Sequence, residues 1–103
     1  MSDEPSDEEA RARAIALLEA NHAFPTDYSI TVIAMATEEV TVAIVEAAFA
    51  DEESPPEPTA HERKASAGGK YLSHRLKVRA RDAEHVLVIY ARLRSVDGVR
   101  TIL

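Results

Sequence analysis

Residues 70–81 read Lys-Tyr-Leu-Ser-His-Arg-Leu-Lys-Val-Arg-Ala-Arg, the most regular strand pattern in the chain. Side chains of a strand point alternately to its two faces, so this stretch divides into two sets. One face carries apolar residues, interrupted only by His74: Leu72, Leu76, Val78 and Ala80. The other carries polar and basic residues: Tyr71, Ser73, Arg75, Lys77 and Arg79. The pattern predicts a strand with one buried side and one side facing water.

The segments around this strand indicate a βαββαβ order. Residues 28–35 alternate in the same way and are rich in β-branched side chains, so they are also expected to be a strand. Thr37 and Asp82 are expected to cap two helices. The buried stripes predicted for these helices are Val40, Ile44 and Ala47, and then Val86, Ile89, Tyr90 and Leu93. Two shorter strands are expected at residues 59–66 and 99–103, with a hairpin turn at residues 67–69.

Chains with this order of strands and helices commonly adopt one known fold. Two βαβ units joined by a hairpin form a four-stranded antiparallel sheet with both helices on one face. Right-handed crossovers place the first and third strands in the centre and the other two at the edges. We therefore predict an α+β sandwich of the ferredoxin-like type, with the second face of the sheet left open.

One domain and an N-terminal extension are expected. Residues 1–23 form an acidic extension with a helix, which begins at a capping box made by Ser6 and Glu9. Residues 24–103 form the ferredoxin-like domain. The full length of 103 residues suits a single domain of this kind.

Composition excludes several classes of protein. The chain has no Cys, which rules out a disulfide framework and thiolate metal sites. No apolar run reaches the roughly 18 residues of a membrane span, and the acidic start is unlike a secretory signal, so we expect a cytoplasmic protein without membrane contact.

Residues 1–62 carry 15 acidic and 2 basic side chains, and residues 63–103 carry 3 acidic and 10 basic ones. An anionic partner for the basic part, or attraction between the two parts, would explain this division.

The titratable residues do not indicate a catalytic or metal site. The chain has four histidines: His22, His61, His74 and His85. No two of them have the spacing of helical metal ligands. We expect His74 to be a hydrogen-bonded histidine in the core or at its rim, and His85 to be solvated at the start of its helix. Neighbours on a strand face opposite ways, so Ser73 and His74 cannot act as nucleophile and base. The acidic runs at 38–39 and 51–53 belong to a cap and a loop. The prediction is a non-enzymatic protein without a cofactor or metal.

The open face of the strand at 70–81 is the candidate binding surface. Its residues are Lys70, Tyr71, Ser73, Arg75, Lys77 and Arg79. The cationic groups can bind an anionic partner, and the hydroxyls add hydrogen bonds. We expect a protein partner or a second copy of the chain, with a small-molecule ligand as a further option. A homodimer is suggested by apolar residues on the far side of the first capped helix, namely Val42, Val45 and Phe49.

RNA binding is the alternative function for the same face. RNA-recognition domains of ferredoxin-like fold stack bases on aromatic residues of their central strands. The strand at 70–81 has a single aromatic residue, Tyr71, and the sequence pI of about 5.1 opposes nonspecific phosphate binding. A regulatory or adaptor module is therefore the leading prediction, ahead of nucleic-acid binding.

Several short segments occur in an order and spacing shared with a known family. They are Phe24-Pro25, residues 28–36, residues 69–73, Val86, Ile89-Tyr90, Leu93, Gly98-Val99 and Leu103. Together they resemble the YbeD-like family of small bacterial proteins of unknown function. The resemblance implies a ferredoxin-like fold similar to ACT regulatory domains, which bind small molecules, often amino acids, between two such domains. Family members often have Gly at the position of Ala34, which weakens the expectation of such a ligand, and tend to be apolar at that of His74.

Overall fold

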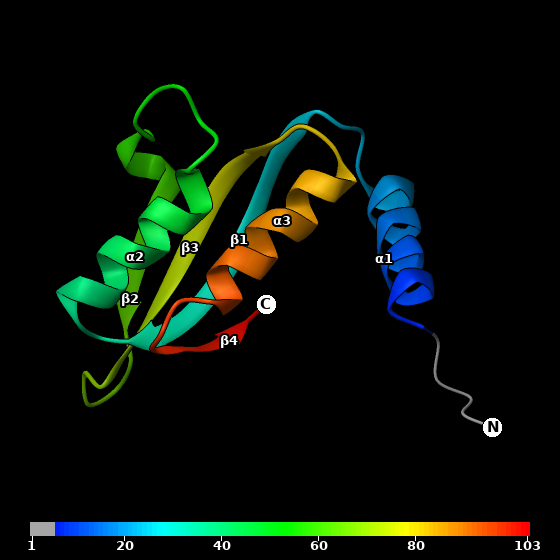
Figure 1. The fold of residues 1–103 in the computed structure, drawn as a ribbon. Helices are drawn as coiled ribbons and strands as arrows, with labels where there is room; N and C mark the ends of the chain where they lie inside the picture. The colour runs from blue at the N-terminus through cyan, green and yellow to red at the C-terminus, as the bar shows by residue number, and fades with distance from the viewer. Residues whose placement is uncertain (1–5) are drawn as a thin grey trace.

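The computed structural model describes residues 6–103 of the chain, and residues 1–5 of the expected N-terminal extension lie outside this part. The helices and strands follow one another in the predicted order (Figure 1). They are α1 (Asp7–Asn21), β1 (Thr26–Met35), α2 (Glu38–Phe49), the short 3₁₀ helix η1 (Pro58–Ala60), β2 (His61–Ala65), β3 (Tyr71–Ala80), α3 (Ala83–Arg94) and β4 (Val99–Ile102).

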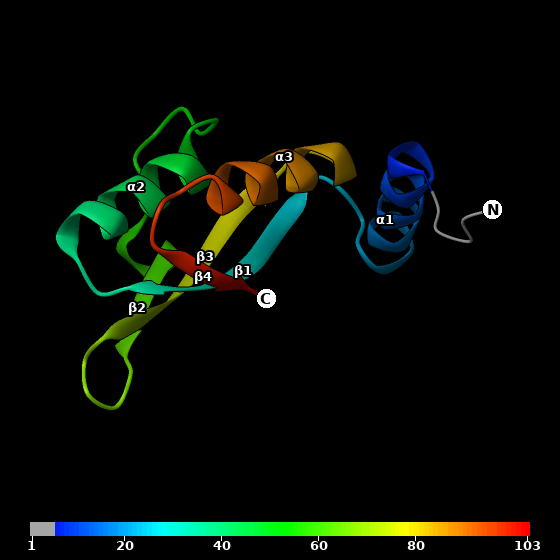
Figure 2. The ribbon, with the colours of Figure 1, turned by 60° about the horizontal axis from the view of Figure 1, so that its bottom comes forward.

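The sheet has the predicted ferredoxin-like topology. Its strand order is β2-β3-β1-β4, and each neighbouring pair is antiparallel. The two long apolar strands, β1 and β3, are central and pair along their whole length, from Thr26 opposite Ala80 to Met35 opposite Tyr71. Both α2 and α3 lie side by side on one face of this sheet (Figure 2).

The core lies between these two helices and the inner face of the sheet. Apolar residues at alternate strand positions and at helical spacing fill it: Ile30, Val32, Ala34, Ile44, Ala48, Phe49, Leu76, Val78, Ile89 and Leu93. The predicted caps hold both helices, since the hydroxyl of Thr37 accepts from the Val40 N–H and a carboxylate oxygen of Asp82 accepts from the His85 N–H. The alternation of apolar and polar residues along β1 and β3 therefore correctly predicted which strand residues face the core.

The buried stripe of α2 differs from the prediction by about one residue. The residues it buries are Thr41, Ile44, Ala48 and Phe49, and Val45 packs partly against the core. Phe49 is only 7% exposed, whereas Val42 remains 46% exposed. The predicted outward stripe of Val42, Val45 and Phe49 was therefore wrong, because two of its three members face the domain's own core. These three residues therefore do not form an apolar surface for a second copy of the chain.

The edge strand β2 is shorter than predicted. It begins at His61 instead of Thr59, because Pro58 starts a 3₁₀ turn that carries Thr59 and Ala60 away from the sheet. Proline lacks the N–H that a continuing strand would need. As a result, β2 pairs only with Leu72–Leu76 of β3, and the rest of β3 has no strand on that side.

The helix α1 stands beside the domain, near the start of α3 (Figure 1). Ser6 caps it as predicted, with its hydroxyl 3.2 Å from the N–H of Glu9. None of its residues is fully buried, and an exposed ion pair joins Arg11 to Glu84 at 3.8 Å. Among residues 6–103, no helix is both long and apolar enough to cross a membrane.

Candidate binding surface

Three exposed cationic side chains line the open face of β3. We call Arg75, Lys77 and Arg79 the basic row; they occupy alternate positions of the strand and are all exposed. Because alternate side chains of a strand share a face, the row points away from the helices. Across β1 its neighbours are small or acidic: Thr31, Ser29 and Asp27. The predicted site residues on β3 are therefore brought together on one surface.

Tyr71 marks the other end of this face. Its ring is half-buried, with the Lys70 ammonium 5.5 Å and the Arg100 guanidinium 6.0 Å from its centre. Lys70 itself precedes β3, so it reaches the surface from the hairpin turn. Ser73 lies half-buried between Tyr71 and the basic row. Arg100 was not among the predicted site residues, because nothing local shows that the turn into β4 brings it beside Tyr71.

Acidic groups on the open face only partly offset the basic row. Asp27 forms an ion pair with Arg79 at 3.5 Å, with both side chains more than half exposed. Exposed pairs of this kind contribute little to stability, so Arg79 remains available to a partner. Glu62 of β2 lies opposite Arg75, and Lys64 lies opposite Ser73. Lys64 is a further cation of this face that the prediction did not include.

A hydrogen-bonded cluster anchors the loop after α2 to α3. Asp51 accepts two hydrogen bonds from the Arg92 guanidinium, at 2.6 and 3.1 Å, and its Oδ2 lies 2.9 Å from Nε2 of His85. The prediction that His85 is solvated was wrong. The His85 side chain is 4% exposed and that of Asp51 25%. The partners are 34 and 41 residues apart in the chain, so no local pattern shows the contact.

The bonding of His85 defines its role. Its Nδ1 accepts the backbone N–H of Arg81 at 3.1 Å, so the ring proton is on Nε2, which donates to Asp51. Both ring nitrogens are thus engaged, and neither is free to accept a proton from a substrate. Hydrogen bonds from Arg92, more than any other cause, lower the pKa of Asp51 to about 2. The cluster is a structural clamp with an ionised carboxylate at its centre.

Replacing Asp51 with Asn should weaken this clamp. We expect a loss of about 2 kcal/mol in the free energy of unfolding at pH 7, since the charge-assisted hydrogen bonds become neutral. The folded-state pKa of about 2 lies below the ordinary value of 3.8, so the stabilisation is complete above pH 3.8 and fades as the pH falls toward 2. Urea denaturation of the variant and the unmodified chain at pH 7 and at pH 2 measures the difference in their free energies of unfolding. Exposed Glu53→Gln is the matched control, and equal stability of both variants at pH 7 would contradict the clamp.

A hydrogen-bonded pair of histidines, one of them buried, joins β2 to β3. Nε2 of His61 lies 2.8 Å from Nδ1 of His74, and the two rings are stacked. As predicted, His74 is a hydrogen-bonded core residue, with no exposed surface. Its Nε2 is buried without a hydrogen-bond partner among the described residues. The prediction did not foresee that His61 would meet it, because the two residues are 13 apart and come together only through strand pairing.

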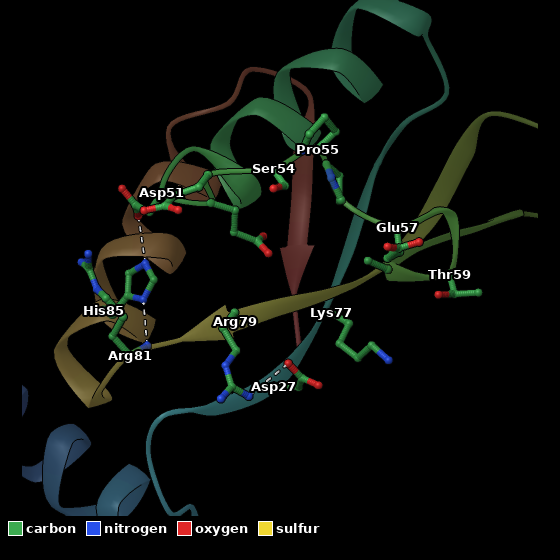
Figure 3. A pocket seen from close by; sticks show the side chains of 14 residues that line it. Asp27, Asp51, Ser54, Pro55, Glu57, Thr59, Lys77, Arg79, Arg81 and His85 are labelled. Carbon is green, nitrogen blue, oxygen red and sulfur yellow. Dashed lines mark hydrogen bonds and ion pairs between the residues drawn. The ribbon is translucent and has the colours of Figure 1, made fainter.

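The structure also contains a hollow of about 600 Å³ beside the unpaired part of β3 (Figure 3). On one side Lys77 and Arg79 border it, and on the other lies the loop that contains Ser54, Pro55 and Glu57 (Figure 3). Glu52 also lines it, and burial raises the pKa of its carboxyl. Within residues 6–103, no three His, Asp or Glu side chains gather in a way that could hold a metal ion.

Comparison with known protein families found one family model that matches most of this chain. A family model described as "Protein of unknown function (DUF493)" matches residues 19–103, which include the whole sheet and both packed helices. The chain belongs to the DUF493 family. The resemblance to YbeD-like proteins is thereby confirmed. No curated protein matches this DUF493 chain. The family description assigns no activity.

Proposed function

We propose that this DUF493 protein is a non-enzymatic regulatory or adaptor module that holds an acidic surface of a partner protein on the open face of its sheet. The observation that carries the proposal is the basic row. Three adjacent cations point the same way from a rigid central strand, and they are exposed in the described part of the chain. Such an array attracts and orients an acidic partner.

The position of the row supports binding more than catalysis. Arg75, Lys77 and Arg79 have cationic side chains and are exposed, so they can form ion pairs with carboxylates of a partner. The buried His85 has both nitrogens occupied by structural partners. The surface therefore offers recognition groups and no paired acid and base.

Charge reversal of the row tests the proposal. We expect Arg75→Glu with Lys77→Glu to abolish retention of specific proteins from a cell extract, since the acidic partner would meet like charge. The melting temperature should change by less than about 3 °C, because exposed charges contribute little to folding. Arg11→Glu with Arg13→Glu on α1 changes the net charge equally and should retain the same proteins as the unmodified chain. Unchanged retention by the β3 variant would refute the proposal.

RNA is a second candidate because of Tyr71. An aromatic ring on a central strand with Lys70 and Arg100 beside it can stack a base and hold a phosphate. Filter binding to a random single-stranded RNA at 50 and 200 mM salt separates the two functions. The RNA function requires binding at low salt that falls steeply at the higher salt and is lost in Tyr71→Ala. The protein-binding function requires almost no RNA retention at either salt concentration.

A further inference from the structure

One stretch of the central strand β3 has an open backbone edge. β1 pairs with β3 as far as Ala80, whereas β2 pairs only with Leu72–Leu76. Residues 77–80 therefore lie in the sheet with a strand on one side only. Every second residue of a strand directs its N–H and C=O to the same side, so this edge presents free donors and acceptors. None of the loop hydrogen bonds of residues 6–103 reaches these four residues.

The chain's own neighbouring loop does not fill this edge. The residues preceding β2 turn away in η1, which begins at Pro58. Pro55 and Pro56 line the hollow beside the edge but have no N–H to donate to β3. The loop thus stands opposite the edge and leaves a hollow of about 600 Å³ between them (Figure 3). An extended segment of four residues is about 13 Å long, which matches the length of unpaired strand.

We propose that this edge binds an extended acidic segment of a partner protein as an added β-strand, continuing the sheet where β2 stops. The inference rests on the proposed function and names the way in which the acidic partner is held. Backbone hydrogen bonds to residues 77–80 would supply affinity, and side chains would supply selectivity, as in other cases of strand addition.

Charge determines which segment fits. On the open face, residues of an added strand lie directly beside Lys77 and Arg79, at about 5 Å between Cβ atoms. Acidic residues at alternate positions would therefore pair with both cations. A second copy of this chain joined edge to edge would instead place Lys77 and Arg79 against the same cations of its twin. Like charges at that distance oppose pairing, so the edge favours an acidic segment of another protein.

The other side of the hollow also offers hydrogen bonding. One carboxylate oxygen of Glu52 is buried there without a partner among the described residues. Buried acceptors are normally satisfied, and an unsatisfied one is costly. A donor on the inner side of an added strand would satisfy this oxygen. On its strand side the hollow thus has an open edge with the cations Lys77, Arg79 and Arg81. Its loop side has the free acceptor and the carboxylates of Glu53 and Glu57, so the acidic side chains of an added strand would fit only on the side of the cations.

The test uses the full chain and the synthetic peptide acetyl-Glu-Val-Glu-Val-Glu-amide. We expect this peptide to shift the backbone amide resonances of residues 77–80. At saturation it should slow hydrogen exchange at least tenfold at Lys77 and Arg79, whose N–H groups face the open edge. Exchange should change little at Val78 and Ala80, which are paired with β1, and at residues 72–76, which are paired on both sides. A peptide of the same charge with N-methyl groups on alternate residues should bind at least tenfold more weakly, because it lacks the donors of a strand. The Lys-for-Glu peptide should not bind.

Several outcomes would overturn the inference. Equal affinity for the N-methylated peptide would show charge attraction without strand pairing, and the proposed function would survive while the edge site would not. No peptide binding at millimolar concentration would remove the edge site, whereas the proposed function stands or falls with the Arg75 and Lys77 variant. Protection of residues 77–80 in the free protein as concentration rises would assign the edge to a second copy. Displacement of the peptide by single-stranded RNA would assign it to nucleic acid.

Discussion

Lowering the pH from 7.5 to 4.5 should destabilise the domain by about 2 to 3 kcal/mol, and His74 should account for most of this loss. His74 is fully buried, and its one hydrogen bond is to another histidine. Burial lowers the pKa of His74 from 6.5 to about 4, and the nearby charges of His61 and Arg63 act in the same direction. One unit of pKa corresponds to about 1.4 kcal/mol.

The direction of the effect follows from which state binds protons. The unfolded chain takes up a proton at His74 near pH 6.5, whereas the folded chain resists protonation down to about pH 4. Stability is therefore complete above pH 6.5 and falls as the pH drops from 6.5 to 4. Burial also lowers the pKa of His61, which adds to the loss. This window lies above the one for Asp51, which acts between pH 3.8 and about 2.

Two variants identify the residue responsible. His74→Leu removes the titrating ring from an apolar site, so between pH 7.5 and 4.5 this variant should lose only the smaller part of the stability that His61 contributes. His61→Gln keeps a hydrogen-bonding side chain beside His74 and should retain most of the acid-induced loss. Urea denaturation at several pH values measures both. If His74→Leu loses stability over this range as steeply as the unmodified chain, the buried histidine is not the cause.

Replacing Gly98 with Ala should cost about 2 to 4 kcal/mol, the second large effect. Gly98 has a φ of +95°, where side chains are strained. A Cβ there would lie 2.8 Å from Cγ2 of Val40, which packs against the core. The turn between α3 and β4 therefore needs glycine both for its backbone angle and for the close approach of α2. The expected fall in melting temperature is at least about 10 °C.

Gly68 provides the matched control. Its φ is +96°, nearly that of Gly98, but a Cβ there would meet nothing within 4 Å. Gly68→Ala should therefore show only the backbone cost, about 1 to 2 kcal/mol. The double variant Gly98→Ala with Val40→Ala should recover part of the loss by removing the contacting methyl. Equal destabilisation by the two single glycine variants would show that the close approach to α2 contributes nothing.

The alternation of apolar and polar residues was enough to predict the sheet. The period of two along 28–35 and 70–81 assigns each side chain to a face before any contact is known, and the polar character of 59–66 places that strand at an edge. The helix stripe of α2 was harder, because valine and alanine surround the whole helix. With so many small apolar residues, a rotation of one position leaves the pattern almost unchanged, and Phe49 was placed on the wrong side.

Part of the candidate binding surface could also be predicted from the alternation of side chains along β3. The basic row belongs to one strand, so its common orientation follows from strand geometry alone. Lys64 and Arg100 join it from other strands, and only the pairing of β2 and the path into β4 show this. For His85 there was a usable signal, since it lies four residues before the buried Ile89 on the same helix face.

The sequence by itself determined the order of the elements, the inner face of the central strands and the orientation of the basic row, because these depend on neighbours two to four residues apart. Only the tertiary structure brought Asp51 to His85 and Arg92, stacked His61 on His74 and left residues 77–80 with an open edge. Each of these depends on the path of a loop between distant segments. A loop is positioned by the packing at both of its ends, and no periodic pattern within it records where it will lie.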